Sequence, residues 1–184
     1  MDLPGTLVLV VGPSGAGKDT LINAARAALA GDAGYVFPRR VVTREAVAAL
    51  EDHDSISTAD FALQERNGAY ALSWEAHGLR YGLPVSLVAD LEAGRVVVLN
   101  ASRAMIATAT AKFPGTKVVL IEASREMRAA RLAGRGRETE AEIAARLDRE
   151  VRAPMPEAIR IDNSGALADG TARFVAALKV FAAH

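Results

Sequence analysis

The stretch that decides the fold is residues 6–20, which read TLVLVVGPSGAGKDT. Its first six residues form a continuous apolar run, typical of a strand buried on both faces of a parallel sheet. A glycine-rich turn follows. Good helix formers then continue over 18–30, with Gly31 placed to end the helix. Strand, glycine loop and helix in this order predict the opening of an α/β domain.

The turn has the residues of a phosphate-binding loop, or P-loop. Backbone N–H groups of such a loop surround phosphate oxygens, and the dipole of the following helix adds to the attraction. We expect Lys18 to reach the β- and γ-phosphates of ATP. A plain glycine turn needs neither this lysine nor so many small residues, which favours the phosphate-binding interpretation. The predicted nucleotide-binding residues are Gly12, Pro13, Ser14, Gly15, Ala16, Gly17, Lys18, Asp19 and Thr20.

One position departs from the common P-loop pattern, because Asp19 stands where a serine or threonine usually binds Mg²⁺. A carboxylate is a hard oxygen ligand that suits Mg²⁺, so we predict Asp19 as the metal ligand. The apolar run 96–99 ends at Asn100 rather than at an acid. Asp19 in the loop would therefore replace the metal-binding acid that is absent from the end of this strand. The alternative is that Asp19 only complements the helix dipole, while Thr20 contacts the α-phosphate.

The rest of the 184-residue chain continues to alternate between strands and helices. We expect strands at 96–100, 117–121 and 158–161, and helices at 85–93, 103–112, 124–133, 138–152 and 166–182. This order predicts one domain with a mostly parallel sheet and helices on both faces. We expect its core to comprise residues 1–35 and 85–184. Residues 36–84 break the pattern, with strands at 40–43 and 69–74, and predict an inserted subdomain.

Composition excludes several classes of protein. The cysteine count of 0 excludes disulfides, iron–sulfur clusters and thiol nucleophiles. Lys plus Arg and Asp plus Glu are both 22, a balance that argues against a nucleic-acid or membrane-surface binder. No apolar run has the roughly 18–20 residues of a membrane span, and no basic leader precedes the first strand. We therefore expect a cytoplasmic protein with a small-molecule substrate, and the sequence leaves its oligomeric state open.

From end to end the chain resembles the guanylate kinase family. The matching pieces are GPSGAGK at 12–18, TR at 43–44, GLRYG at 78–82, RLAGRGRE at 131–138 and RL at 146–147. The resemblance implies an α/β P-loop NTPase fold of the nucleoside monophosphate kinase type, in which residues 36–84 bind the phosphoryl acceptor. It also implies an arginine-rich lid over the phosphates at 131–149. By the same resemblance, Arg135 and Arg146 are catalytic lid residues, and Asp162-Asn163 lies near the adenine pocket.

The insertion departs from guanylate kinases where they recognise the base. Leu72 and Leu83 stand where that family has polar residues that read guanine. A site built to hydrogen-bond a base does not replace both readers by leucine, because the base's donors would be left unpaired. Arg40 stands in place of a serine that faces the acceptor phosphate, and His53 in place of a tyrosine.

These features resemble a sister group, the ribose 1,5-bisphosphate phosphokinases of bacterial phosphonate catabolism. The matching pieces are GKD at 17–19, RVVTR at 40–44, ALSWEAHGL at 71–79, YG at 81–82 and LNASRA at 99–104. The resemblance implies transfer of the γ-phosphoryl group of ATP, with Mg²⁺, to the 1-phosphate of ribose 1,5-bisphosphate. The acceptor ligands expected from it are Arg40, Arg44, Tyr81 and His53, followed by Arg39 and Arg80.

The proposed reaction agrees with the lack of an obvious general base. The attacking phosphate oxygen is already ionised at pH 7, so catalysis consists of positioning and charge neutralisation. Two alternatives stay open: a guanylate kinase or related nucleotide kinase, and an inert guanylate-kinase-like binding module. Trp74 is a candidate wall for the sugar, although a core aromatic residue is the more usual role.

Overall fold

The computed structural model describes residues 3–44, 53–76, 78–134, 139–148, 155 and 157–182. Its central sheet has five strands in the order β2–β7–β1–β8–β9, and all of its pairings are parallel. The strands are β1 (Thr6–Val11), β2 (Tyr35–Val36), β7 (Val96–Asn100), β8 (Lys117–Glu122) and β9 (Ile159–Asp162). The predicted parallel α/β sheet is therefore confirmed.

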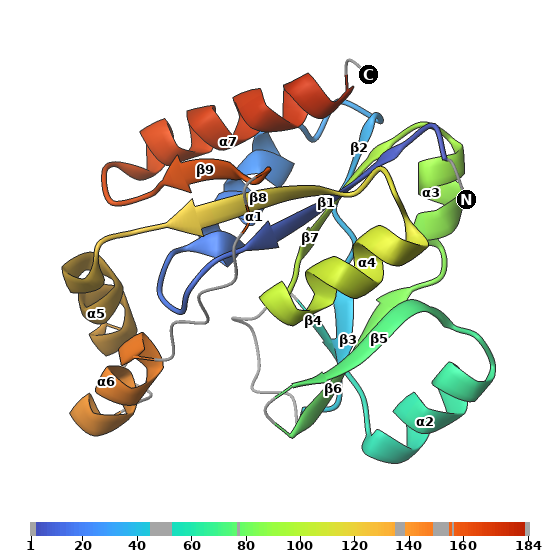
Figure 1. Ribbon diagram of the computed structural model, residues 1–184, viewed down its shortest axis with the longest axis horizontal. Helices are drawn as coiled ribbons and strands as arrows, with labels where there is room; N and C mark the ends of the chain where they lie inside the picture. Colours follow the sequence, from blue (N-terminus) through green and yellow to red (C-terminus); the bar gives the residue numbers. More distant parts are fainter. Residues whose placement is uncertain are drawn as a thin grey trace.

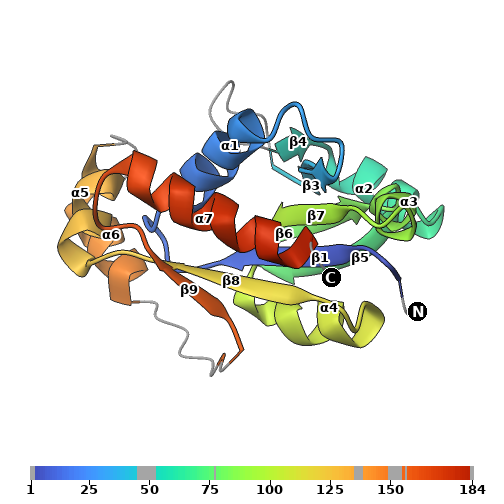
Figure 2. The ribbon, with the colours of Figure 1, turned by 90° about the horizontal axis from the view of Figure 1, so that it is seen from above.

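Strand β1 lies at the centre of this sheet because it is apolar on both faces. Alternate side chains of a strand point to opposite faces. Val8 and Val10 pack with the helices α1 (Lys18–Ala28) and α7 (Leu167–Ala182). Leu7 and Leu9 pack on the other face, with α3 (Leu87–Glu92), the 3₁₀ turn η1 (Arg103–Met105) and α4 (Ile106–Lys112). Figure 2 shows α1 and α7 on the opposite side of the strands from α4.

A separate helix pair, α5 (Arg125–Ala133) and α6 (Glu140–Asp148), follows β8. The two helices pack through Leu132, Ile143 and Leu147, which form a small apolar cluster of their own. Of the expected helix 138–152, the structure describes 139–148. Figure 1 shows this pair on one side of the molecule and a second sheet on the other. The loop between β1 and α1 lies between them in that view.

The second sheet has four strands in the order β4–β3–β6–β5. They are β3 (Arg40–Val42), β4 (His53–Ser55), β5 (Tyr70–Ala76) and β6 (Leu79–Pro84), and the helix α2 (Thr58–Arg66) lies between β4 and β5 in the chain. The sequence predicted two of these strands and missed β4, β6 and α2. It also missed β2, which pairs with β7 in the central sheet.

Helix α2 covers one face of the second sheet, which we call the outer face. Glu65 of α2 accepts hydrogen bonds from Ser73 on β5 and Arg80 on β6. The Arg80 guanidinium also lies 4.9 Å from the ring centroid of Phe61, the buried residue of α2. Within the described part of the chain, no helix is long and apolar enough to cross a membrane.

Candidate active site

The glycine loop fits tightly between β1 and α1. Gly12 has a φ of +153°, and a Cβ at this position would overlap the backbone oxygen of Ile121 on β8. Gly17 has a φ of +90°, and a Cβ there would lie 2.5 Å from the side-chain nitrogen of Asn163. A side chain at either position would strain the backbone, and it would collide with β8 at Gly12 and with the Asn163 side chain at Gly17. The glycines therefore let the loop pack closely against β8 and Asn163.

Lys18 is the first residue of α1, and its side chain folds back over the loop. Its Nζ atom donates to the carbonyl oxygens of Gly12 at 2.9 Å and Pro13 at 3.2 Å. These two contacts hold the ammonium group against the start of the loop. The predicted loop residues 12–20 thus form one continuous strand–loop–helix unit.

Two residues that the sequence did not predict as loop supports hold this unit in shape. The carbonyl oxygen of Ala16 accepts hydrogen bonds from Asn163 Nδ2 at 2.8 Å and Arg131 at 3.2 Å. Arg131 also donates to the carbonyl oxygen of Asn163 at 2.7 Å. Asn163 is 2% exposed, so this network is a buried clamp that ties the loop to α5 and to the end of β9. The resemblance placed Asn163 near the adenine pocket, and no local pattern signalled the clamp.

Asp19 and Asn100 meet at the carboxyl end of the central sheet, as their predicted positions imply. Asn100 Nδ2 donates to Asp19 Oδ1 at 2.5 Å, which orients the carboxylate. Both residues line a small recess with Arg40 of the second sheet. The described residues include no group of three or more His, Asp or Glu side chains that could hold a metal by themselves. A single carboxylate beside a phosphate-binding loop fits Mg²⁺, which is usually bound by one or two carboxylates plus substrate phosphates.

Three of the four predicted acceptor ligands share one face of the second sheet, opposite α2, which we call the inner face. Arg40 pairs with His53 across β3 and β4, and Val42 pairs with Tyr81 across β3 and β6. Paired residues project from the same face, and so do residues two apart. Arg40, His53 and Tyr81 therefore project together. The Arg40 guanidinium lies 5.6 Å from the Tyr81 ring centroid.

The other predicted site residues are less closely assembled. Arg44 is exposed and lies two residues beyond the end of β3. Arg146 is half-buried in the last turn of α6. Arg135 lies outside the described residues, so its predicted place in a lid over the phosphates stays a prediction.

Arg39 and Arg80, the next acceptor candidates, both make contacts with the protein itself. Arg39 donates to the carbonyl oxygen of His53 and forms an ion pair with Asp54 at 3.3 Å. Arg80 is held on the outer face by Glu65. The Ser73 hydroxyl, followed by Arg80, holds the pKa of the Glu65 carboxyl below its usual range. These contacts favour a structural role for both arginines.

Leu72 and Leu83 are core residues. They are 5% and 1% exposed and belong to the same apolar cluster as Leu99 and Met105. At the two positions where guanylate kinases read the base, this chain therefore presents buried apolar side chains.

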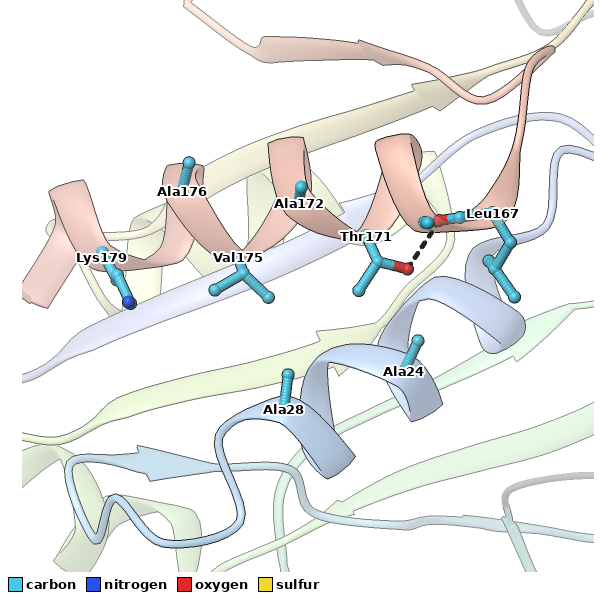
Figure 3. A pocket seen from close by; sticks show the side chains of 9 residues that line it. Ala24, Ala28, Leu167, Thr171, Ala172, Val175, Ala176 and Lys179 are labelled. Carbon is cyan, nitrogen blue, oxygen red and sulfur yellow. Dashed lines mark hydrogen bonds between the residues drawn. The ribbon is translucent and has the colours of Figure 1, made fainter.

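A shallow groove between α1 and α7 includes none of the predicted site residues (Figure 3). Small side chains such as Ala24, Ala28 and Ala172 line it, and Thr171 donates to the carbonyl oxygen of Leu167 at its edge. Lys179 supplies its one charged group. The groove therefore offers little of the chemistry that a phosphate site needs.

Comparison with known proteins gives close relatives over the whole chain. The chain is 48% identical over 173 residues to ribose 1,5-bisphosphate phosphokinase PhnN of Brucella melitensis, covering 93% of this chain and 90% of that protein. It is 50% identical to the protein of the same name from Methylobacterium radiotolerans, with coverage of 96% and 99%. It is also 50% identical over 182 residues to a bifunctional ribose 1,5-bisphosphokinase-thymidine phosphorylase of Cupriavidus necator, of which it spans 30%. No family model matches the chain.

Solved structures show the same fold at lower sequence identity. Guanylate kinase from Anaplasma phagocytophilum matches with a TM-score of 0.71 and 19% identity over 97% of this chain and 86% of that chain. A gluconokinase from Sinorhizobium meliloti matches with a TM-score of 0.53, covering 99% and 95%. Fold and loop together define a P-loop kinase. The sequence identities then place the chain more narrowly: it belongs to the ribose 1,5-bisphosphate phosphokinase PhnN family.

Proposed function

We propose that this protein phosphorylates ribose 1,5-bisphosphate with ATP, giving 5-phosphoribosyl 1-diphosphate and ADP. The observation that carries the proposal is the 48–50% identity, over nearly the full length of both chains, to kinases of that name. By the sequence resemblance, the reaction belongs to alkylphosphonate degradation in the cytoplasm, with a small-molecule substrate and no nucleic-acid or membrane partner.

The chemistry requires positioning rather than a general base. An oxygen of the acceptor 1-phosphate attacks the γ-phosphorus of ATP, a new P–O bond forms, and the bond to the β-phosphate oxygen breaks to release ADP. The nucleophile is already ionised at pH 7, so no proton has to be removed. The protein has to bring two highly charged phosphates together and offset their repulsion.

The donor half of the site consists of the loop and its clamp. Loop N–H groups and the N-terminus of α1 bind the ATP phosphates. The Lys18 ammonium group neutralises the negative charge that develops on the β- and γ-phosphates during transfer. The clamp by Arg131 and Asn163 on Ala16 supports this assignment, because it holds the loop in a single shape before ATP binds. Arg135 and Arg146 complete the donor half as lid residues that cover the transferred phosphoryl group.

Asp19 is the residue that would hold Mg²⁺, oriented by its hydrogen bond from Asn100. When bound, the metal supplies positive charge to the β- and γ-phosphates. The adjacent Arg40 adds a second cationic group at the same recess.

The acceptor half is the inner face of the second sheet. Arg40, His53 and Tyr81 provide two nitrogen-bearing side chains and one hydroxyl for acceptor phosphates, and Arg44 adds an exposed cation nearby. Arg40 is particularly suited to this role because its Nε atom is buried and has no hydrogen-bond partner among the described residues. A buried donor without a partner is unfavourable until a ligand satisfies it.

A guanylate kinase activity is the second candidate, since the fold matches that of a guanylate kinase at a TM-score of 0.71. The buried Leu72 and Leu83 oppose it, because they leave the donors and acceptors of guanine without partners. The test is to compare ADP release with ribose 1,5-bisphosphate and with GMP as acceptor. We expect kcat/KM for the sugar bisphosphate to be at least about a hundredfold higher than kcat/KM for GMP. A hundredfold ratio corresponds to about 2.8 kcal/mol, which is the size of the cost of leaving polar groups of the base unpaired. Equal or higher kcat/KM for GMP refutes the proposed function.

The acceptor assignment has its own variant. Arg40→Ala should raise the KM for ribose 1,5-bisphosphate far more than the KM for ATP, because an acceptor phosphate loses a charge-assisted partner. The matched control is Arg95→Ala, immediately before β7, because the Arg95 side chain forms an ion pair with Asp90 and is none of the predicted site residues. Parallel rises in both KM values for Arg40→Ala contradict an acceptor role.

A further inference from the structure

The inner face of the second sheet carries an aromatic pair beside its cationic residues. Trp74 on β5 is directly opposite Tyr81 on β6, and their rings are stacked with centroids 5.1 Å apart and an interplanar angle of 10°. The Arg40 guanidinium lies over the same Tyr81 ring. The sheet thus presents, in order from β4 to β5, an imidazole, a guanidinium, a phenol and an indole on one face.

Trp74 differs from its inner-face neighbours in burial. Leu72 and Leu83 are almost fully buried in the core, and Val42 is 2% exposed. Trp74 packs against this core, and both Trp74 and Tyr81 are only half-buried. Their exposed ring surface belongs to the same face as Arg40 and His53, so it borders the acceptor half of the site.

The polar atom of Trp74 is also available. Within the described part of the chain, the Trp74 side chain forms ring and apolar contacts but no hydrogen bond. Partly buried tryptophans usually find a partner for the indole N–H, and here a ligand oxygen can serve. One side chain therefore offers an apolar ring and a single donor, which suits a sugar ring with its hydroxyl groups.

We propose that Trp74 is a binding residue for the acceptor, and that its ring, held by stacking on Tyr81, is a wall against which the sugar ring lies while its phosphates reach Arg40 and His53. The inference rests on the proposed function and adds to it the part of the site that recognises the sugar. The span is suitable: β3 and β5 are two strand spacings apart, about 10 Å. A phosphate at Arg40 and a ring against Trp74 can belong to one small ligand.

Trp74 provides its own test, because it is the only tryptophan in the chain. Ribose 1,5-bisphosphate is titrated into the wild-type protein without ATP, and the intrinsic tryptophan fluorescence is recorded. We expect a saturable change with a midpoint close to the acceptor KM measured by turnover. Inorganic phosphate at the same ionic strength should give no such change, because it lacks the sugar.

Variants separate a binding role from a structural one. Trp74→Ala should raise the KM for ribose 1,5-bisphosphate about tenfold, the effect of losing a contact of about 1.4 kcal/mol, with the KM for ATP changed less than about twofold. Trp74→Phe, which keeps an aromatic ring, should recover most of this loss. Glu75→Ala is the matched control, because Glu75 is exposed and projects from the outer face.

The outcomes are distinct. If the wild type turns over ribose 1,5-bisphosphate but its fluorescence stays constant at saturating acceptor, Trp74 does not contact the acceptor and the inference is wrong. An unchanged acceptor KM in a folded Trp74→Ala also overturns it. If Trp74→Ala does not fold, the fluorescence titration of the wild type alone tests whether Trp74 contacts the acceptor. No turnover of ribose 1,5-bisphosphate by the wild type refutes the proposed function instead.

Discussion

The pair formed by Asp19 and Asn100 gives a sharp prediction about the metal. In Asp19→Ser the carboxylate that Asn100 orients is replaced by the hydroxyl that most P-loops carry. A contact to a charged group is worth about 1.5–3 kcal/mol. At 1.4 kcal/mol per tenfold, we expect the Mg²⁺ concentration for half-maximal rate to rise by about 10- to 150-fold.

Asn100→Asp in the Asp19→Ser background should recover part of this loss, since a carboxylate returns within 2.5 Å of the original one. In the wild-type background the same change places two carboxylates side by side, and their repulsion offsets the added charge. The two substitutions should therefore be non-additive by about 0.5–3 kcal/mol.

The assay is the initial rate against free Mg²⁺ at saturating ATP and acceptor, for the wild type, both single variants and the double variant. Thr20→Ala is the neighbouring control. The reasoning is refuted if Asp19→Ser leaves the Mg²⁺ requirement unchanged and only lowers the free energy of unfolding by the 0.3–1 kcal/mol of a helix-dipole contact. A raised requirement in Thr20→Ala alone identifies Thr20 as the ligand side chain.

Three further changes test other parts of the account. Asn163→Ala should cost about 1 kcal/mol in urea unfolding and raise the KM for ATP, because the loop clamp loses one donor; an unchanged KM removes the clamp from the mechanism. Glu65 has a lowered pKa owing to Ser73 and then Arg80, so its contribution to stability is present above the unfolded pKa of about 4.3 and disappears as the pH falls through the folded value. Glu65→Gln should therefore lower the urea midpoint at pH 7 but much less at pH 3, and an equal loss at both pH values contradicts this. Leu72→Glu should destabilise the protein by about 3–5 kcal/mol by burying an unpaired charge and should not confer GMP phosphorylation; a stable variant that phosphorylates GMP places Leu72 in an open site.

Local sequence was sufficient for the strand–loop–helix unit that we propose as the ATP site. The strand β1, the loop and the start of α1 are contiguous, and each has its own signal in apolar runs, glycines and helix formers. The missed elements lack such signals. β2 has only two residues and belongs to the central sheet through its pairing with β7. Only Phe61 of α2 is buried, so the helix shows no clear apolar stripe.

The candidate site divides in the same way. Lys18 and Asp19 are predictable because the motif itself names them, whereas the clamp joins Ala16 to residues 115 and 147 positions away. The common face of Arg40 and Tyr81 depends on the register of β3 with β6, which short strands joined by long connections do not reveal. Resemblance supplied the predicted acceptor residues, and the strand register shows which of them project together.

The central claim is that the phosphoryl group of ATP is transferred to the anomeric phosphate of a sugar bisphosphate. The most direct measurement is ³¹P NMR of a reaction that contains ATP, ribose 1,5-bisphosphate and an equal concentration of GMP. We expect the 1-phosphate signal to be replaced by the two coupled signals of a diphosphate ester on C1, with the 5-phosphate unchanged and no GDP formed. Formation of GDP with the 1-phosphate signal intact would contradict the account.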